Sequence, residues 1–182
     1  YDALIHDLAL LAPTGRASKR MSETTLYPAS TIHRFLKWNK ENNTFAVCEN
    51  NKDKSKLIIV DESSMIDINL FSSLLRGLTS NIKLILVGDY DQLPSVGPGL
   101  ILKDLIESGK IETIKLEYLY RQDKSSYINI LAKEIKENNL SEDSFKDYTD
   151  YRFLKCNSPY ITESIRNICI DLIKHGYDYK RV

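Results

Sequence analysis

Two adjacent carboxylates, Asp61 and Glu62, directly follow a run of four apolar residues, Leu57–Val60. The run is too short for a buried helix and three of its residues are β-branched, so it predicts a strand of a parallel sheet that is covered on both faces. Ligands of open α/β sheets bind beyond the carboxyl ends of the strands, where both carboxylates would stand. One carboxylate there can hold Mg²⁺, and a second group can align water against a phosphoryl group. The pattern therefore indicates nucleotide hydrolysis, although an acid after an apolar strand also arises by chance in α/β proteins.

A second apolar run, Leu8–Ala12, also ends in polar residues. It leads into the segment Pro13-Thr14-Gly15-Arg16, which should turn the chain and open a helix. Helix-start amides and guanidinium groups suit phosphate, so this segment is a candidate for an anion or phosphodiester contact. A solvated basic helix face is the alternative interpretation.

A third apolar run, Lys83–Val87, leads into a loop rich in glycine and proline, Gly88–Gly99. Loops of this composition usually only turn the chain. This one carries two aspartates and Gln92, and it would place them at the same sheet edge as Asp61. We therefore favour a functional role for the loop.

The whole chain alternates strand patterns with helix patterns, which predicts an α/β fold with a parallel sheet. Apolar residues at helical spacing predict further helices, and short apolar runs predict two further strands. The expected helices are Ser30–Leu36, Asp67–Leu78, Leu100–Ser108, Ile128–Ile135 and Ile161–Leu172. The expected additional strands are Glu112–Glu117 and Arg152–Lys155.

Residues 37–55 have the composition of an insertion carried outside this core. Two short strand-like runs flank an Asn-Asn turn there, which predicts a β-hairpin. We expect one domain made of residues 1–36 and 56–182, interrupted by this hairpin. Trp38 or Phe45 could stack on a nucleic-acid base, and packing of the two rings against each other across the hairpin is an equal alternative.

The composition is that of an ordinary globular protein without a strong net charge. The 182 residues include 25 Lys and Arg and 25 Asp and Glu, so any contact with a polyanion must be local. Cys48, Cys156 and Cys169 have neither zinc spacing nor a disulfide pattern, which favours a reducing, cytoplasmic setting. No apolar run in the sequence approaches the roughly 20 residues of a membrane span.

Five segments together carry a resemblance to a known family. In order, they read LLAPTGRASKRM, STIHRFL, LIIVDESSMID, LILVGDYDQLPSVGPG and YRQ. Their order and spacing resemble the first motor domain of RecD-like DNA helicases, which belong to the exodeoxyribonuclease V alpha-subunit family within the 5′-to-3′ branch of superfamily-1 helicases. The similarity extends from Leu8 to about Leu140.

The resemblance implies a P-loop NTPase (RecA-like) three-layer domain with a mostly parallel sheet. It implies a parent protein that couples ATP hydrolysis, with Mg²⁺, to 5′-to-3′ translocation on single-stranded DNA in recombination and repair. The implied partners are single-stranded DNA or DNA ends, a second motor domain of the same parent chain and other exodeoxyribonuclease V subunits, in the bacterial cytoplasm. The hairpin would occupy the place of a strand-separating pin.

The resemblance also implies roles for individual residues. Asp61 matches the Mg²⁺-associated aspartate of the family, and Glu62 matches the glutamate that activates water. Gln92 and Arg121 match residues that approach the γ-phosphate. Segments that lie near single-stranded DNA in the family match Pro13, Thr14, Gly15, Arg16, Thr31 and His33.

The sequence departs from the family in its phosphate-binding loop. A motif G-x-x-x-x-G-K-[ST] would precede Leu8, and the only Gly-Lys pair, Gly109-Lys110, lacks both the upstream glycine and the following hydroxyl. The chain also begins at Tyr1 without a Met. We therefore expect a fragment of a longer helicase that is inactive alone. A degenerate domain that binds DNA or protein, and a different P-loop ATPase of a signalling or clamp-loading type, stay open as alternatives.

A nuclease site is a weaker hypothesis. Asp89 and Asp91 together with Asp61 could form a two-metal carboxylate cluster. The continuation Gln92-Leu93-Pro94 fits the helicase motif instead. We therefore favour the ATPase interpretation.

Overall fold

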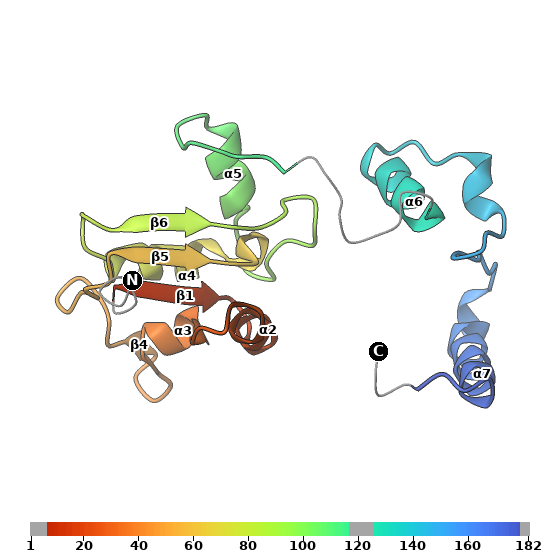
Figure 1. Ribbon diagram of the computed structural model, residues 1–182, viewed down its shortest axis with the longest axis horizontal. Helices are drawn as coiled ribbons and strands as arrows, with labels where there is room; N and C mark the ends of the chain where they lie inside the picture. Colours follow the sequence, from red (N-terminus) through yellow and green to blue (C-terminus); the bar gives the residue numbers. More distant parts are fainter. Residues whose placement is uncertain (1–6, 117–125, 179–182) are drawn as a thin grey trace. The chain divides into compact units, whose positions relative to one another are not determined.

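The computed structural model describes residues 7–116 and 126–178 (Figure 1). The chain divides into two compact units, Tyr1–Leu116 and Glu117–Val182. The first unit holds the β-sheet, and the described part of the second unit is helical. Within the described residues, no helix is both long enough and apolar enough to span a bilayer.

The first unit alternates strands and helices around a four-stranded sheet. Its elements are β1 (Leu8–Ala12), α2 (Gly15–Thr25), β2 (Ala29–Thr31), α3 (Ile32–Phe35), β3 (Trp38–Asn39), β4 (Thr44–Phe45), β5 (Leu57–Val60), η1 (Ser63–Met65), α4 (Ile68–Arg76), β6 (Lys83–Leu86) and α5 (Ile101–Glu107). The strand order is β2-β1-β5-β6, and each neighbouring pair is parallel. The arrows of β1, β5 and β6 in Figure 1 accordingly point the same way. The predicted α/β fold with a mostly parallel sheet is confirmed.

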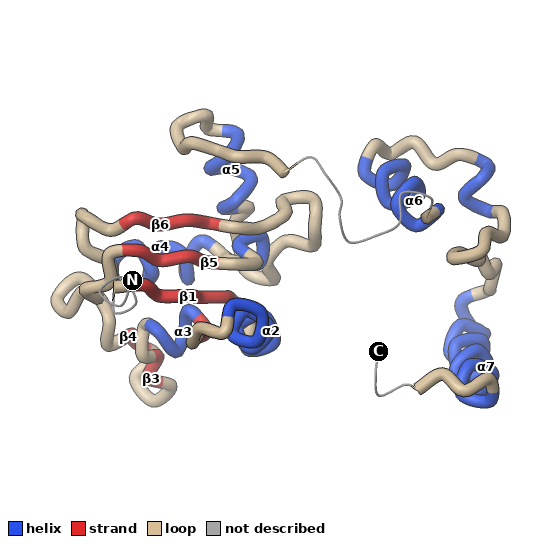
Figure 2. Tube along the Cα trace, in the orientation of Figure 1, coloured by secondary structure: helices blue, strands red, loops and turns tan. Residues whose placement is uncertain are grey.

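One face of the sheet forms the core with helices α3 and α4 (Figure 2). Helix α4 begins after Asp67, whose side-chain oxygen Oδ1 accepts hydrogen bonds from the amides of Asn69 (2.8 Å) and Leu70 (2.9 Å). Such an N-cap satisfies amides that the first turn of a helix leaves unpaired. The residues buried together in this core are Leu11, Ile32, Leu36, Val47, Ile58, Val60, Ile66, Leu70, Leu74 and Leu78.

The opposite face of the sheet is covered less completely. Along β5, Ile58 and Val60 are buried, whereas Leu57 and Ile59 are only half-buried. On the neighbouring strand, Ile85 remains 46% exposed among the described residues. The expectation that the Leu57–Val60 strand is covered on both faces is therefore met fully on one face and in part on the other. Strand periodicity fixes which residues share a face, but the elements that cover each face come from elsewhere in the chain.

Helix α4 offers a direct test of this core. Leu74 is fully buried, while Leu75, the next residue along the helix, is 47% exposed. We expect Leu74→Ala to lower the free energy of unfolding by about 3 kcal/mol, because the lost side chain leaves a cavity. Leu75→Ala should cost less than about 1 kcal/mol. Chemical denaturation of both variants measures the difference, and equal losses would contradict the packing described here.

The hairpin forms within residues 37–48 as expected from the sequence. Strands β3 and β4 are antiparallel, with Trp38 opposite Phe45 and Asn39 opposite Thr44. Asn43 in the turn has a positive φ of 53°, a conformation that asparagine tolerates better than most residues. The side-chain oxygen of Asn39 accepts a hydrogen bond from the Glu41 amide (2.9 Å) and so closes the turn.

Three predicted elements differ in the structure. Ala29–Thr31 forms strand β2, although the predicted helix began at Ser30, and the helix α3 that follows has only four residues. Residues 112–116 and 152–155 form no strand. Ile114 and Leu116 are instead 84% and 88% exposed. A strand needs a hydrogen-bonding partner, and an apolar pattern alone does not supply one.

The second unit consists of α6 (Tyr127–Lys136), η2 (Glu142–Phe145), η3 (Ser158–Tyr160) and α7 (Ile161–Lys174). The predicted helices Ile128–Ile135 and Ile161–Leu172 correspond to α6 and α7. The ring of Tyr127 stacks on that of Tyr148 with centroids 3.8 Å apart. The Ser126 hydroxyl donates to the Asp150 carboxylate (2.5 Å), and this hydrogen bond lowers the pKa of Asp150. These contacts fasten the loop after η2 to the start of α6.

Candidate functional site

The carboxyl ends of the parallel strands bring three sequence segments to one edge of the sheet. The Asp61 amide donates to the Leu11 carbonyl of β1 (2.9 Å), and the Val87 amide donates to the Val60 carbonyl of β5 (2.8 Å). The last residue of β1 also pairs in register with Thr31, the last residue of β2. The turn before α2, the acidic pair Asp61-Glu62 and the loop after β6 therefore all leave the sheet at the same edge (Figure 1).

The acidic pair occupies a strained turn. Asp61 and Glu62 are both half-buried. The side-chain oxygen Oδ1 of Asp61 accepts a hydrogen bond from the Glu62 amide (2.9 Å). Glu62 itself has φ 53° and ψ 39°, the left-handed region that costs a residue with a Cβ about 1–2 kcal/mol. Strain of this kind persists where surrounding contacts enforce it, and it is frequent at functional sites.

This strain makes a prediction about stability. Asparagine tolerates the left-handed region, so Glu62→Asn should raise the free energy of unfolding by about 0.5–1 kcal/mol. Lys37→Asn is a matched control, because Lys37 is exposed and has φ 54°. Both variants should gain stability in thermal or chemical denaturation. A loss at Glu62 with a gain at Lys37 would show that the Glu62 side chain stabilises the fold.

Both ends of the loop Gly88–Gly99 pack against residues 63–68, which directly follow the acidic pair. A Cβ atom placed on Gly88 would lie 3.0 Å from the Ser63 amide nitrogen, so only glycine fits there without a shift. A Cβ atom on Gly97 would lie 2.7 Å from the Asp67 side chain. The Ile68 amide also donates to the Pro98 carbonyl (2.9 Å). The loop is thereby fixed to the elements that follow Glu62.

The middle of this loop presents Gln92 to solvent. The Asp89 carboxylate accepts a hydrogen bond from the Asp91 amide (3.0 Å), and the Asp89 carbonyl accepts one from the Gln92 amide (3.2 Å). This turn leaves the Gln92 side chain exposed. The position of Gln92 is therefore set by the hydrogen bonds of Asp89 and by the packing of the two ends of the loop.

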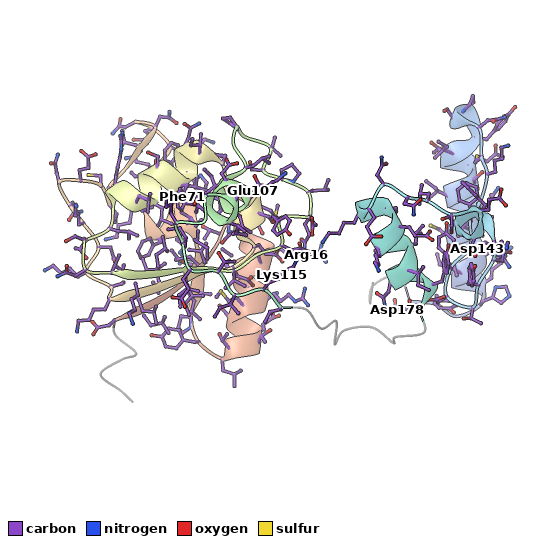
Figure 3. All side chains as sticks on the ribbon, turned by 90° about the horizontal axis from the view of Figure 1, so that it is seen from above. Arg16, Phe71, Glu107, Lys115, Asp143 and Asp178 are labelled. Carbon is purple, nitrogen blue, oxygen red and sulfur yellow. The ribbon has the colours of Figure 1, made fainter. Side chains whose placement is uncertain are left out.

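The segment after β1 starts helix α2 at the same edge. The Thr14 hydroxyl oxygen accepts a hydrogen bond from the Ala17 amide (3.2 Å) and so caps the helix. Gly15 is exposed, and a Cβ placed on it would meet no described atom within 4 Å apart from its chain neighbours and the backbone of its own helix. Arg16 is exposed on the first turn, where Figure 3 labels it. Half-buried Pro13 precedes them. The arrangement leaves an open, partly positive helix start.

Thr31 and His33 have defined contacts of their own. The Thr31 hydroxyl oxygen accepts a hydrogen bond from the Arg34 amide (3.1 Å) and caps α3. The His33 ring lies 5.9 Å from the Phe45 ring and 6.1 Å from the Trp38 ring, centroid to centroid. The ring centroids of Trp38 and Phe45 are 4.6 Å apart across the hairpin. The structure therefore contains the predicted packing of these two rings against each other. Trp38 is still 38% exposed.

Not all the sequence candidates can be located. Arg121 lies outside the described residues. The other candidates gather at the strand ends, but within residues 7–116 no hydrogen bond or ion pair joins the side chains of Asp61 or Glu62 to that of Gln92. The described residues also contain no group of three or more His, Cys, Asp or Glu side chains placed to hold a metal ion by themselves. A two-metal cluster of Asp61, Asp89 and Asp91 is therefore not formed there.

Sequence reasoning missed the residues that fasten the loop. Asp67 caps α4, and its side chain also occupies the space that a Cβ on Gly97 would need, so one side chain packs against both the helix and the loop. The Asp before an apolar helix pattern was a visible capping signal. The contact with Gly97, thirty positions further along, had no signal in the sequence.

Comparisons with known proteins show which family and which relatives this chain resembles. The family model described as an AAA domain matches residues 2–98, which is more than half of the chain. The chain is similar to the ATP-dependent RecD2 DNA helicase of Deinococcus radiodurans, with 40% identity over 116 residues, or 64% of this chain and 16% of the relative. It is also similar to the RecBCD enzyme subunit RecD of Mycolicibacterium smegmatis, with 33% identity over 147 residues, or 71% of this chain and 26% of that subunit. The chain thus spans a sixth to a quarter of the length of these relatives.

Solved structures of the Pif1 helicase from Bacteroides share the fold. The Pif1 structure bound to ssDNA has a TM-score of 0.52 and 19% sequence identity. The match covers 91% of this chain and 46% of the Pif1 chain. The structure in complex with ADP-AlF4 has a TM-score of 0.51 at the same identity, and it covers 90% of this chain and 48% of that one. At this identity the likeness establishes the fold.

Proposed function

Because the chain belongs to the AAA domain family and is RecD-like in sequence, we propose that it is part of an ATP-dependent DNA helicase that translocates 5′-to-3′ on single-stranded DNA. The observation that carries the proposal is the meeting of the acidic pair, the Gln92 loop and the α2 start at one edge of a parallel sheet. That edge is where α/β proteins bind their ligands. The similar Deinococcus protein is named an ATP-dependent DNA helicase.

The acidic pair would serve the hydrolysis of ATP. Asp61 fits a role at Mg²⁺, because one of its oxygens is taken by the Glu62 amide while the other has no hydrogen bond among the described residues. Magnesium in nucleotide sites commonly uses one or two carboxylates together with substrate phosphates, and it neutralises charge that develops on them. Glu62 would accept the proton of the attacking water and orient that water.

Two further residues would act on the transferred phosphoryl group. Gln92 is presented by its anchored turn and would contact the γ-phosphate, so that the loop responds to nucleotide state. Arg121 would approach the γ-phosphate and stabilise its developing charge, as cationic groups do in phosphoryl transfer. The remaining parts would come from a phosphate-binding loop and a second motor domain of the parent protein. We expect the 182-residue chain alone to be inactive.

The other end of the same edge would contact single-stranded DNA. The exposed Gly15 and Arg16 offer an amide and a guanidinium group to a phosphate. Thr31 ends the neighbouring strand and its capping hydroxyl can still donate a hydrogen bond. The residues proposed for DNA contact are Pro13, Thr14, Gly15, Arg16, Thr31 and His33. The hairpin in residues 37–55 would act as a strand-separating pin, and other exodeoxyribonuclease V subunits are proposed partners.

Hydrolysis and unwinding by the full-length protein test the proposal. ATP turnover should rise when single-stranded DNA is added, and a duplex with a 5′ single-stranded tail should be unwound in preference to one with a 3′ tail. A protein that hydrolyses ATP with no response to DNA would fit a different P-loop ATPase. Binding of DNA without any hydrolysis would fit a degenerate interaction module.

Arg16 provides a test of the DNA-binding part. Each phosphate contact to a single strand contributes about 0.7 to the slope of log affinity against log salt concentration. We expect Arg16→Ala in the full-length protein to weaken binding to an oligonucleotide and to reduce this slope by about 0.7. Lys19→Ala is the control, because Lys19 lies on the same helix and pairs with Glu23 (3.8 Å). An equal loss of slope in both variants would indicate a general effect of positive charge on α2.

A further inference from the structure

The turn after the acidic pair contains a buried hydroxyl group without a hydrogen-bond partner among the described residues. The group is the enclosed side-chain hydroxyl of Ser64. The neighbouring hydroxyl of Ser63 is also buried, but it donates to the Val60 carbonyl (2.9 Å). A buried hydroxyl without a partner is unfavourable, because it has lost its hydrogen bonds to water. Such a group in a native protein is explained by a functional role, by strain or by a bound water or ion.

The position of Ser64 supplies that explanation. Ser64 lies in η1, two residues after Glu62. A Cβ atom placed on Gly88 would lie 3.1 Å from the Ser64 amide nitrogen, so the backbone at the start of the Gln92 loop passes directly beside this residue. The nearby Ser63 amide donates to the Val87 carbonyl (2.9 Å). The backbone of Ser64 thus lies against the first residue of the loop, two residues after Glu62, and its hydroxyl is buried in the same turn.

We propose that Ser64 is a positioning residue that couples the Gln92 loop to Glu62 during hydrolysis. Its hydroxyl forms a hydrogen bond with the polar groups of Asp89 when bound nucleotide draws the middle of the loop into its hydrolysing arrangement, while Gly88 stays packed against η1. The bond exists in one arrangement and not in the other, so it favours the first by its own free energy. In the structure described here the Ser64 hydroxyl has no partner among the described residues, which corresponds to the arrangement without this bond. This inference rests on the function proposed above for the sheet edge that carries Asp61 and Glu62.

The test uses Ser64→Ala in the full-length protein, with Ser63→Ala as the matched control. For Ser64→Ala we expect kcat for ATP at saturating single-stranded DNA to fall about tenfold, which corresponds to about 1.4 kcal/mol, while KM for ATP stays within about twofold. Ser63→Ala should keep the wild-type ratio of DNA-stimulated to basal hydrolysis, because the Ser63 hydroxyl bonds within its own turn.

Unfolding of the 182-residue chain separates positioning from structural support. Loss of the bonded Ser63 hydroxyl should lower the unfolding midpoint, whereas loss of the unbonded Ser64 hydroxyl should leave it unchanged or raise it. A lower midpoint for Ser64→Ala would overturn the inference, as would wild-type kcat in that variant. An unmutated full-length protein that fails to hydrolyse ATP would instead overturn the proposed function itself.

Discussion

Replacement of Glu62 by Gln is expected to abolish ATP hydrolysis by the full-length protein while ATP binding stays nearly intact. Glutamine has the shape of glutamate but cannot accept a proton from water, and general-base catalysis contributes about 10²–10⁴-fold to a rate. We therefore expect kcat to fall at least about 100-fold. The left-handed backbone at this position costs Gln about as much as Glu, so the variant should keep the stability of the parent fold.

Phosphate release and titration with a fluorescent nucleotide measure the two quantities separately. Glu107→Gln is a suitable control, because Glu107 ends α5 and, among the residues that the structure describes, its side chain is engaged only in a surface ion pair with Lys103 (3.7 Å). That variant should retain wild-type kcat. Normal hydrolysis by Glu62→Gln would remove Glu62 from the chemistry and leave the acidic segment with a structural role.

Replacement of Arg121 by Ala should lower ATP turnover by roughly 10³-fold or more, the effect associated with arginines that stabilise the transition state of phosphoryl transfer. The role rests on the match of the YRQ segment to the helicase family, since Arg121 lies outside the described residues. Lysine keeps the charge but not the planar, forked donor geometry of arginine. Arg121→Lys should therefore recover only part of the lost activity.

The readout for Arg121 is kcat at saturating ATP and DNA. Arg152→Ala serves as the comparison, because the Arg152 side chain is exposed and pairs with Asp147 (3.1 Å). The comparison variant should behave as the unmutated protein does. Should both variants retain full turnover, the cation on the γ-phosphate must come from another residue.

The central strands could be predicted because their sequences leave few alternatives. Leu8–Ala12, Leu57–Val60 and the run from Lys83 are short and apolar, and in the structure they pair side by side in parallel. Strand β2 escaped prediction because Ala29–Thr31 has no apolar run, and in the described sheet it is an edge strand paired only with β1. The strand predicted at residues 112–116 is absent for the opposite reason: these residues have an apolar alternation, but no described strand pairs with them.

The identities of the candidate site residues could be predicted, but their geometry could not. An acidic pair after a buried strand points to chemistry, yet nothing in the letters indicates the left-handed conformation of Glu62. The contact between Asp67 and Gly97 and the unbonded hydroxyl of Ser64 depend on how the loop folds back over η1 and α4. These features arise from packing between distant segments, which local patterns do not encode.

A crystal structure of the full-length protein with Mg²⁺, ADP-AlF4 and a short single-stranded DNA would test most directly whether the sheet edge with Asp61 and Glu62 binds nucleotide. The phosphate mimic should lie beyond the carboxyl ends of β5 and β6, with the ion next to Asp61 and with Glu62, Gln92 and Arg121 around the transferred group. A nucleotide bound anywhere else on the molecule, with these four side chains apart from it, would contradict the proposed site.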